Sequence, residues 1–379
     1  MRETELRRMI AEEFLSVIQD PRMERTRKHS LETIVVISLL AVICGADSFV
    51  AIELYAKTRK EWLATFLDMA EGVPSHDTFG RVFASLNPMM LAEAFRRWTE
   101  AMATSSKEKL IAIDGKTLRR AFKQAGDGVF VHMVSAWSSA NGVVLGQVKT
   151  EEKSNEITAI PALLDLLDVK STLVTIDAAG TQTAIAQKIV DQGGDYLLAV
   201  KGNQPSLHEA MIRRFEGVGS FYNECTVAET HERAHGREER RRVEVSHSLE
   251  GIDSSERWPK LATLIHIEST RTVKAKTSTE HRYYISSRRS LSAKQALAAV
   301  RSHWGIENQL HWVLDVAFRE DDCRVRAGNA AANFSAVRQL ALGLLKKRTE
   351  KKCGIKIRRQ CAGWDNNFLL QVIGLQLPD

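Results

Sequence analysis

Two aspartates, Asp114 and Asp177, each end a short apolar run, in the segments IAIDGKTL and TIDAAGTQ. Short apolar runs are typical of buried strands, so each aspartate is expected where a strand ends. When neighbouring strands end side by side their last side chains meet, and paired carboxylates bind hard cations. A third acid, Glu307, lies in a predicted helix among aromatic residues, in RSHWGIENQLHW. Its charge there needs a metal or a basic group to offset desolvation.

Three acids brought together could hold two magnesium ions. Two divalent ions about 3.5 to 4 Å apart activate the attacking oxygen and stabilise the leaving oxygen in phosphodiester hydrolysis or transfer. Taken singly, each acid has an ordinary alternative explanation as a strand-end cap, a turn former or a surface charge. The two-metal hypothesis therefore depends on the order of the elements that carry the acids.

The elements after residue 109 alternate in an informative order. Three strands come first, in KLIAIDGKTL, VFVHMVSAW and VVLGQVKT, and the Asn-Gly pair of SSANG favours a hairpin between the last two. A helix capped by Ser154 or Asn155, a strand, a helix closed by glycine and a fifth strand follow. The order βββ-αβ-αβ predicts a mixed sheet with helices on its faces, which is the strand order of the ribonuclease H-like fold.

The first hundred residues have apolar side chains at helical spacing and predict an all-helical region. Gly72 and Pro74 break one helix, and Ser75 or Asp77 is the expected N-cap of the next. This pattern is compatible with a helix-turn-helix and equally with plain helix packing.

The predicted fold class is mixed α/β, a ribonuclease H-like catalytic core with a β-rich insertion, preceded by an all-helical N-terminal domain. The expected boundaries are a helical domain over 1–103, the core over 104–345 with the insertion at about 204–287, and a basic tail with a short helix over 346–379.

The composition excludes several classes of protein. The chain has 379 residues, 44% of them hydrophobic and 26% charged, which suits a soluble protein of two or three domains. Its five cysteines are scattered and never spaced as Cys-x-x-Cys, so neither a disulfide framework nor a zinc ribbon is indicated and a reducing cytoplasm fits. The most apolar run, residues 34–44, is too short to span a bilayer, so no membrane association is expected.

The net charge of +6 is concentrated near the C-terminus. Residues 346–359 contain eight basic side chains and one acidic side chain, so the rest of the chain is close to neutral. Such a segment is either a solvated, mobile tail or an arm that contacts phosphate. Lys346, Lys347 and Arg348, which begin it, are candidate DNA-binding residues.

Several segments together resemble the DDE transposases of bacterial insertion sequences, in the H-repeat-associated branch. They are IAIDGKTLRR, KSNEITAIPALLDLLD, TIDAAGTQ, YLLAVKGNQ and RSHWGIENQLHWVLDVAFREDDCRVR. The resemblance covers residues 20–345 and implies that Asp114, Asp177 and Glu307 are the catalytic, metal-binding triad. It also implies two Mg²⁺ ions, with Mn²⁺ as a substitute, and end recognition by the helical region. The implied partners are the terminal repeats and target DNA, bound as double strands by a homodimer, in a bacterial cytoplasm and on the nucleoid.

The helix that carries Glu307 departs from the pattern of the broader relatives. Their Tyr-x-x-Arg-x-x-x-Glu-x-x-x-x-x-x-Lys becomes, at the equivalent positions, Val300, His303, Glu307 and Leu314. The pattern of the H-repeat branch, Arg-x-His-Trp-x-Ile-Glu-Asn-x-Leu-His-Trp, is present in full over residues 301–312. Arg301 and His303 are therefore candidate phosphate contacts by their chemistry alone.

Other side chains near the expected site have two explanations each. Trp304 and Trp312 could stack on an unpaired base, but their eight-residue spacing on one helix face favours packing. His303 and His311 share that spacing and are expected to be hydrogen-bonded structural histidines, because imidazole is a poor ligand for magnesium. Lys201, after the fifth strand, is either a phosphate contact or a plain surface lysine.

The leading hypothesis is an active transposase that cleaves the ends of its element and joins the 3′-hydroxyls to target DNA. One alternative is a catalytically retired, domesticated DNA-binding protein derived from a transposase. Another is a magnesium-dependent nuclease that cuts DNA without strand transfer.

Overall fold

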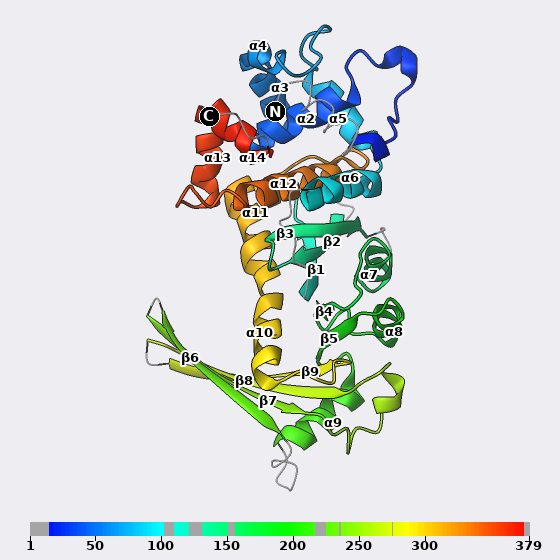
Figure 1. Ribbon diagram of the computed structural model, residues 1–379, viewed down its shortest axis with the longest axis vertical. Coiled ribbons are helices and arrows are strands. Elements are labelled where there is room, and N and C mark those ends of the chain that lie inside the picture. The colour runs from blue at the N-terminus through cyan, green and yellow to red at the C-terminus, as the bar shows by residue number, and fades with distance from the viewer. Residues whose placement is uncertain are drawn as a thin grey trace. The chain divides into compact units, whose positions relative to one another are not determined.

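The computed structural model describes residues 15–101, 110–120, 131–150, 156–216, 225–234, 236–274 and 276–374. The chain divides into two compact units, each built from separate stretches of sequence (Figure 1). The first unit comprises residues 1–106, 115–154 and 307–379, and the second comprises residues 107–114 and 155–306.

The first unit is mostly helical. Its helices are α2 (Leu31–Ile43), α3 (Phe49–Thr58), α4 (Lys60–Leu63), α5 (His76–Ser85), α6 (Pro88–Ala101), α11 (Trp312–Phe318), α12 (Ala330–Lys346), α13 (Ile355–Trp364) and α14 (Asn366–Val372), with the 3-10 turns η2 (Leu15–Val17), η3 (Glu24–Thr26) and η7 (Glu320–Asp322). Helix α12 packs against α2, α5 and α6. The buried amide of Asn333 on α12 donates to the carbonyl oxygens of Phe83 (2.7 Å) and Leu86 (3.0 Å), so a polar side chain closes the end of α5.

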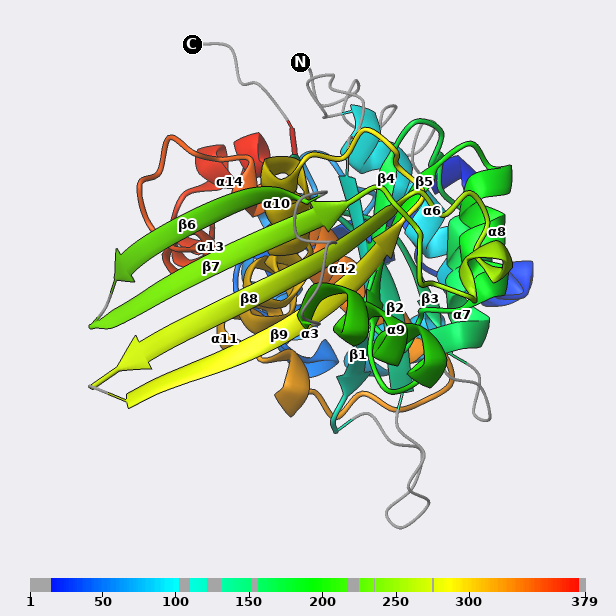
Figure 2. The same ribbon diagram turned by 90° about the horizontal axis from the view of Figure 1, so that it is seen from below.

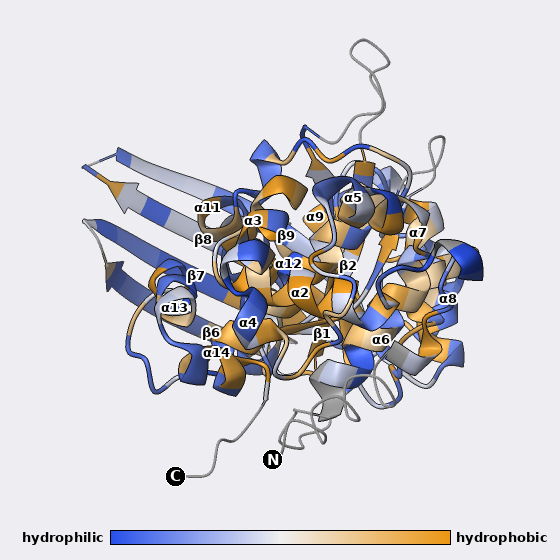
Figure 3. Ribbon diagram, turned by 90° about the horizontal axis from the view of Figure 1, so that it is seen from above, coloured by the Kyte–Doolittle hydropathy of each residue, from blue (hydrophilic) through white to orange (hydrophobic). Residues whose placement is uncertain are grey.

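The most apolar run of the sequence forms α2, which is buried on nearly every side and coloured hydrophobic in Figure 3. Its two buried hydroxyls are both hydrogen-bonded, since Ser38 donates to the carbonyl of Ile34 at 2.8 Å and Thr33 donates to that of Asp68 at 3.2 Å. Among the described residues, no helix has both the length and the apolar character needed to cross a membrane. Of the two cap candidates for α5, Ser75 is the N-cap and accepts from the amide of Thr78.

The strands of the first unit form the predicted hairpin. Strand β2 (Val131–Ser138) pairs antiparallel with β3 (Val143–Lys149), and β2 neighbours β1 (Leu110–Leu118), which begins in the second unit and ends in the first. Gly142 adopts a φ of 66° and donates its amide to Ser138, as the Asn-Gly pair predicts.

The second unit holds the parallel strands and the insertion. Its elements are α7 (Glu156–Leu164), β4 (Leu173–Ile176), α8 (Thr183–Asp191), β5 (Asp195–Val200), α9 (Pro205–Glu216), β6 (Thr226–Ala234), β7 (Arg237–Ser246), the 3-10 turn η5 (Ser255–Arg257), β8 (Thr263–Val273), β9 (Lys276–Ser286) and α10 (Ala293–His303). Strands β1, β4 and β5 are parallel neighbours, and β9 continues the sheet antiparallel to β5. With β3-β2-β1 in one unit and β1-β4-β5 in the other, the predicted order and the ribonuclease H-like core are confirmed. The predicted caps of α7, Ser154 and Asn155, lie outside the described residues.

The predicted β-rich insertion is an antiparallel sheet in the order β9-β8-β7-β6 (Figure 2). Helix α10 packs its apolar side chains on one face, against Val243, Ile265 and Tyr284, while α9 lies against the other face. Because successive side chains of a strand point to opposite faces, alternate residues face α10 and α9.

The helix predicted to carry Glu307 is divided into segments of different geometry. Helix α10 ends at His303, a π-helix η6 covers Ile306–His311, and α11 follows. The π-helix contains Glu307, and π-helical turns inside longer helices often mark functional sites.

Candidate active site

Asp114 and Asp177 follow residues that are partners in the sheet. Ile113 of β1 pairs with Ile176 of β4 in parallel register, so the two aspartates lie at the same level where the pairing of these strands ends. Neighbouring strands lie about 4.8 Å apart, and both side chains are half-buried at this edge. The two acids are neighbours in the second unit, as predicted, but only Asp177 follows a strand end. The predicted place of Asp114 at the end of its strand is wrong, because β1 continues past it to Leu118.

The loop after Asp177 is held by a local network. One carboxylate oxygen of Asp177 accepts the amide of Gly180 at 3.2 Å. The hydroxyl of Thr181 lies 3.1 Å from the carbonyl of Asp177 and 2.6 Å from that of Ala199 on β5. Gln204 donates to the carbonyl of Thr181 at 3.0 Å, so the TIDAAGTQ and KGNQ segments brace each other and orient the aspartate.

The environment of Asp177 disfavours its charged form. Burial raises its pKa above the usual value, and the nearby carboxylate of Glu156 raises it further, against the lowering effect of the Gly180 amide and Lys201. Glu156, the first residue of α7, was not among the acids predicted from the sequence. Its place in SNEITAIP, one of the segments that carry the family resemblance, is the signal that could have found it.

Glu307 lies in the first turn of η6 and belongs to the first unit. Its side chain is 53% exposed, and one carboxylate oxygen lies 3.9 Å from Nδ1 of the buried His311. The expectation of a desolvated charge is therefore wrong, because the surrounding tryptophans do not cover it.

A lysine that sequence reasoning missed joins the ends of two segments in the first unit. Lys116, two residues after Asp114, is only 11% exposed and donates to Asp315 at 2.5 Å. Its ammonium group lies 3.8 Å from carboxylate oxygens of both Glu320 and Asp321 and 3.5 Å from the carbonyl of His311. It thus ties the extension of β1 to the segment that follows Glu307.

The three basic candidates of the second unit have different surroundings. Lys201 is exposed directly after β5 and lies close enough to Asp177 to lower its pKa. Arg301 is engaged by Glu232 at 2.5 Å. Nδ1 of His303 is hydrogen-bonded to the hydroxyl of Thr175 on β4 at 3.0 Å. This contact links the end of α10 to that strand, as expected of a structural histidine.

The two tryptophans are more exposed than their spacing predicts. Trp304 is 41% exposed and Trp312 is 61% exposed, so the preference for core packing is wrong for both. The guanidinium of Arg282 lies 4.6 Å from the centre of the Trp304 ring, which fixes that ring at the surface.

Part of the basic C-terminal segment is structural. Lys346 places its ammonium 4.4 Å from the Trp137 ring centre, and burial lowers its pKa to about 8. Burial also lowers the pKa of Lys347, and Arg348 is half-buried. Further along, Arg358 donates to the carbonyls of Leu345 and Lys346, and the buried Arg359 donates to Val42 at 2.7 Å. These two arginines satisfy helix-end carbonyls, so the segment is not simply a mobile tail.

A basic groove of about 660 Å³ lies in the helical part of the first unit, on residues that the sequence did not single out. Its lining includes the side chains Arg22, Arg25, Lys28, His29 and Arg81. The run DPRMERTRKH contains four of them together with a fifth, Arg27, and would have indicated this groove.

Two family models match this chain, one over its helical N-terminal residues and one over the residues that follow. Residues 12–99 match the domain associated with DDE_Tnp_1, and residues 105–344 match the transposase DDE domain. The YncI protein of Escherichia coli O157:H7, named as a candidate transposase, is 43% identical over 366 residues, which are 95% of this chain and 93% of that protein. The YhhI protein of Escherichia coli strain K12, named as an H repeat-associated candidate transposase, is 40% identical over 366 residues, 95% of this chain and 97% of that protein.

Among solved structures, a piggyBac transposase synaptic complex with hairpin DNA aligns with a TM-score of 0.47 at 10% sequence identity. That alignment covers 99% of this chain and 82% of the other. The family matches and the strand order agree with the resemblance carried by the motifs around Asp114, Asp177 and Glu307. This chain belongs to the bacterial DDE transposases, in their H-repeat-associated branch.

Proposed function

We propose that this protein is the transposase of an insertion sequence. It binds the terminal inverted repeats of its element, cleaves phosphodiester bonds at the ends, and joins the 3′-hydroxyl ends to target DNA. The observation that carries the proposal is the register of Ile113 with Ile176, which puts Asp114 and Asp177 next to each other where the pairing of β1 with β4 ends. Membership of the DDE transposase family supports the same reaction class.

The donor set fits divalent metal ions, which DDE transposases use. Asp114 and Asp177 offer hard carboxylate oxygens, and burial with Glu156 nearby makes the charge of Asp177 costly until a cation offsets it. We assign Asp114, Asp177 and Glu307 as ligands of two Mg²⁺ ions, with Mn²⁺ as a substitute. When bound, such ions activate the attacking oxygen and stabilise the leaving oxygen.

The protein's own groups hold these acids in position. The Gly180 amide and the Thr181 hydroxyl orient Asp177 and its loop. Lys116 binds the His311 carbonyl and so positions the turn that begins at Glu307. Removal of either restraint is expected to lower the cleavage rate without removing a ligand.

DNA is bound, in this proposal, by exposed cations and aromatic rings. The basic groove receives the phosphates of an element end, which gives residues 1–103 their role in end recognition. Lys201 contacts backbone phosphate beside Asp177, and the exposed rings of Trp304 and Trp312 stack on an unpaired base. Arg301, His303, Lys346, Lys347 and Arg348 are secondary candidates, because most are already engaged or partly buried. Residues 104–345 carry the chemistry, and two copies bridge the two ends.

The test is a cleavage assay on DNA that carries the element's own ends, with Mg²⁺, comparing the intact protein with Glu307→Gln. Asp165→Asn is the matched control, because Asp165 is an exposed acid of the second unit that pairs with Lys188. Cuts that need Mg²⁺, vanish with Glu307→Gln and persist with Asp165→Asn support the proposal. Binding without cuts in the intact protein would indicate a retired DNA-binding protein, and cuts without joined products would indicate a nuclease.

A further inference from the structure

The face of the antiparallel sheet that lies against α9 holds a group of polar side chains. Val243 and Ile265 point to the α10 face, so the next residue on each strand, Glu244 and His266, points to the α9 face. Glu244 and His266 are direct register partners on β7 and β8, and His281 on β9 lies diagonally beside His266. Three strands thus deliver acids and imidazoles to one small area.

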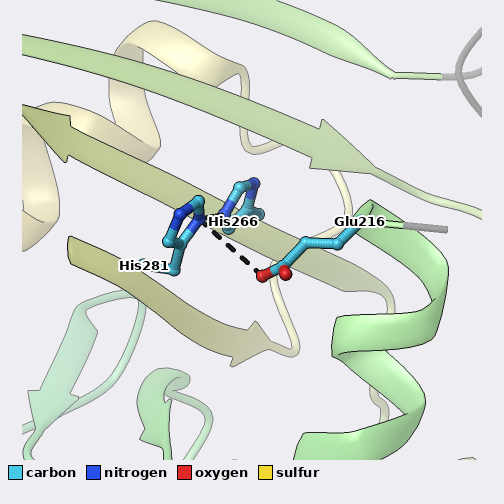
Figure 4. A group of neighbouring side chains, drawn as sticks. All are labelled: Glu216, His266 and His281. Atoms are coloured by element: carbon cyan, nitrogen blue, oxygen red, sulfur yellow. Dashed lines mark hydrogen bonds and ion pairs between the residues drawn. The ribbon is translucent and has the colours of Figure 1, made fainter. Parts of the chain in front are cut away.

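Two of these side chains, His266 and His281, converge with Glu216 of α9 (Figure 4). Glu216, His266 and His281 each present a ligand atom, and these atoms all lie within 4.8 Å of one another. Nε2 of His266 is 3.0 Å from Nδ1 of His281, which is 3.7 Å from a carboxylate oxygen of Glu216. A tetrahedral zinc ion with bonds of about 2.0 to 2.1 Å holds its ligand atoms about 3.3 Å apart, between these two values.

A hydrogen bond to Glu244 orients the ring of His266. Both residues are buried, and Nδ1 of His266 lies 3.0 Å from a carboxylate oxygen of Glu244. A carboxylate accepts the proton of Nδ1, so the lone pair of Nε2 points toward His281 and Glu216. Arg242 donates to the other oxygen of Glu244 at 3.1 Å and fixes the carboxylate. Histidines that bind metals usually donate their second ring nitrogen to a carboxylate in this way.

The point of convergence is open on one side. His281 is 38% exposed and Glu216 is 41% exposed, while His266 is buried beneath the ring of Phe215, 5.4 Å between centres. An ion can therefore enter from solvent and keep a water molecule as a further ligand. The apolar ring closes the opposite side.

We propose that Glu216, His266 and His281 bind a divalent transition-metal ion of the zinc class. Two imidazoles and one carboxylate suit Zn²⁺ and similar ions and are a poor set for Mg²⁺. The site shares no residue with the proposed Mg²⁺ ligands Asp114, Asp177 and Glu307. Glu216 is the last residue of α9, so the ion ties the end of this helix to β8 and β9.

The experiment uses the full chain after treatment with a chelator, in excess Mg²⁺ so that the proposed magnesium ligands are occupied. The protein is titrated with Co²⁺, and the bound Co²⁺ is then displaced with Zn²⁺. One equivalent of Co²⁺ with visible absorption typical of tetrahedral coordination is expected, together with a higher melting temperature on adding Zn²⁺. His281→Ala and Glu216→Gln, both at exposed positions, should weaken binding at least about 100-fold, and Glu244→Gln should weaken it about 10-fold to 100-fold.

Two controls make the result specific. His231→Ala changes an exposed histidine on β6 that pairs with Glu238, and it should bind Co²⁺ as the intact protein does. The double variant Asp114→Asn with Asp177→Asn should also keep the site. The proposal is overturned if the intact protein binds no stoichiometric Co²⁺ in Mg²⁺, or if His281→Ala and Glu216→Gln, folded by circular dichroism, bind it undiminished.

Discussion

The parallel and the antiparallel strands of the second unit differ in where their charged side chains lie and in what offsets the charge. In the parallel pair, Asp177 stands directly after the end of β4, and Asp114 stands in β1 where its pairing with β4 ends. Asp177 is oriented by a backbone amide in surroundings that disfavour its charge. In β6 and β7 the charged residues stand within the strands and pair across them, as Arg241 does with Glu232 and Arg242 with Glu229. The outer parts of these strands are correspondingly coloured hydrophilic in Figure 3. A strand end leaves a carboxylate for an added cation, whereas a strand interior supplies the counter-charge from the neighbouring strand.

The largest effect is expected at the parallel strand ends. Asp177→Asn keeps the size of the side chain and removes the charge, so cleavage of end DNA should fall by roughly a thousand-fold or more. Affinity for the same DNA, measured by fluorescence anisotropy in Ca²⁺, should stay within a few-fold because less negative charge faces the phosphates. Retained cleavage would remove Asp177 from the metal site and end the contrast between the two regions.

The next effect concerns the extension of β1 in the first unit. Lys116→Met leaves the carboxylates of Asp315, Glu320 and Asp321 facing one another, and breaking a buried ion pair in this way costs about 3 kcal/mol. Urea unfolding should show this loss in the free energy of unfolding. Arg119→Ala is the control, since the exposed Arg119 pairs with Asp321 at 3.2 Å and its loss should cost about 0.5 kcal/mol or less. Similar losses for the two variants would mean that the Lys116 network is not buried in solution.

A third test compares how much two carboxylate partners of Arg242 in the antiparallel sheet contribute to stability. Arg242 pairs with the buried Glu244 at 3.1 Å and with the exposed Glu229 at 2.8 Å. Glu244→Ala leaves the buried Nδ1 of His266 without its acceptor and removes one of the two partners of Arg242, so it should lower the free energy of unfolding by about 2 kcal/mol. Glu229→Ala should lower it by about 0.5 kcal/mol or less. Both are to be measured by urea denaturation in the presence of a chelator, and equal losses would show that burial does not decide the strength of these pairs.

The smallest effect is on DNA affinity. Lys201→Ala removes an exposed cation beside Asp177, so the slope of log affinity against log salt should flatten by about 1. Arg240→Ala removes a cation that already pairs with Glu238 at 3.3 Å on its own strand and should leave the slope unchanged. A change of slope for Arg240→Ala alone would reverse the comparison and make the antiparallel sheet the DNA-binding surface.

Much of the core was predictable because its signals are local. Apolar runs before Asp114 and Asp177 identify two strands and the end of the second, and Ser75 and the Asn-Gly pair at 141–142 identify a cap and a turn. Such patterns depend on a few adjacent residues and not on contacts with distant parts of the chain. The family motifs around these positions added the expected reaction.

What could not be predicted depends on contacts between distant segments. Alternation marks β6–β9 as strands but allows many registers, so only the fold pairs Val200 with Tyr283 and sets β9 beside β5. The same choice of register brings His266 and His281 to Glu216, and a different packing of α10 would have buried Trp304 as its spacing suggested. By itself the sequence determined the end of β4 at Asp177 and the apolar part of β1 before Asp114, because these follow from neighbouring residues. The tertiary structure alone decided the burial of Lys346, the network of Lys116 and the histidine cluster, because burial and convergence are properties of surfaces made from separate parts of the chain.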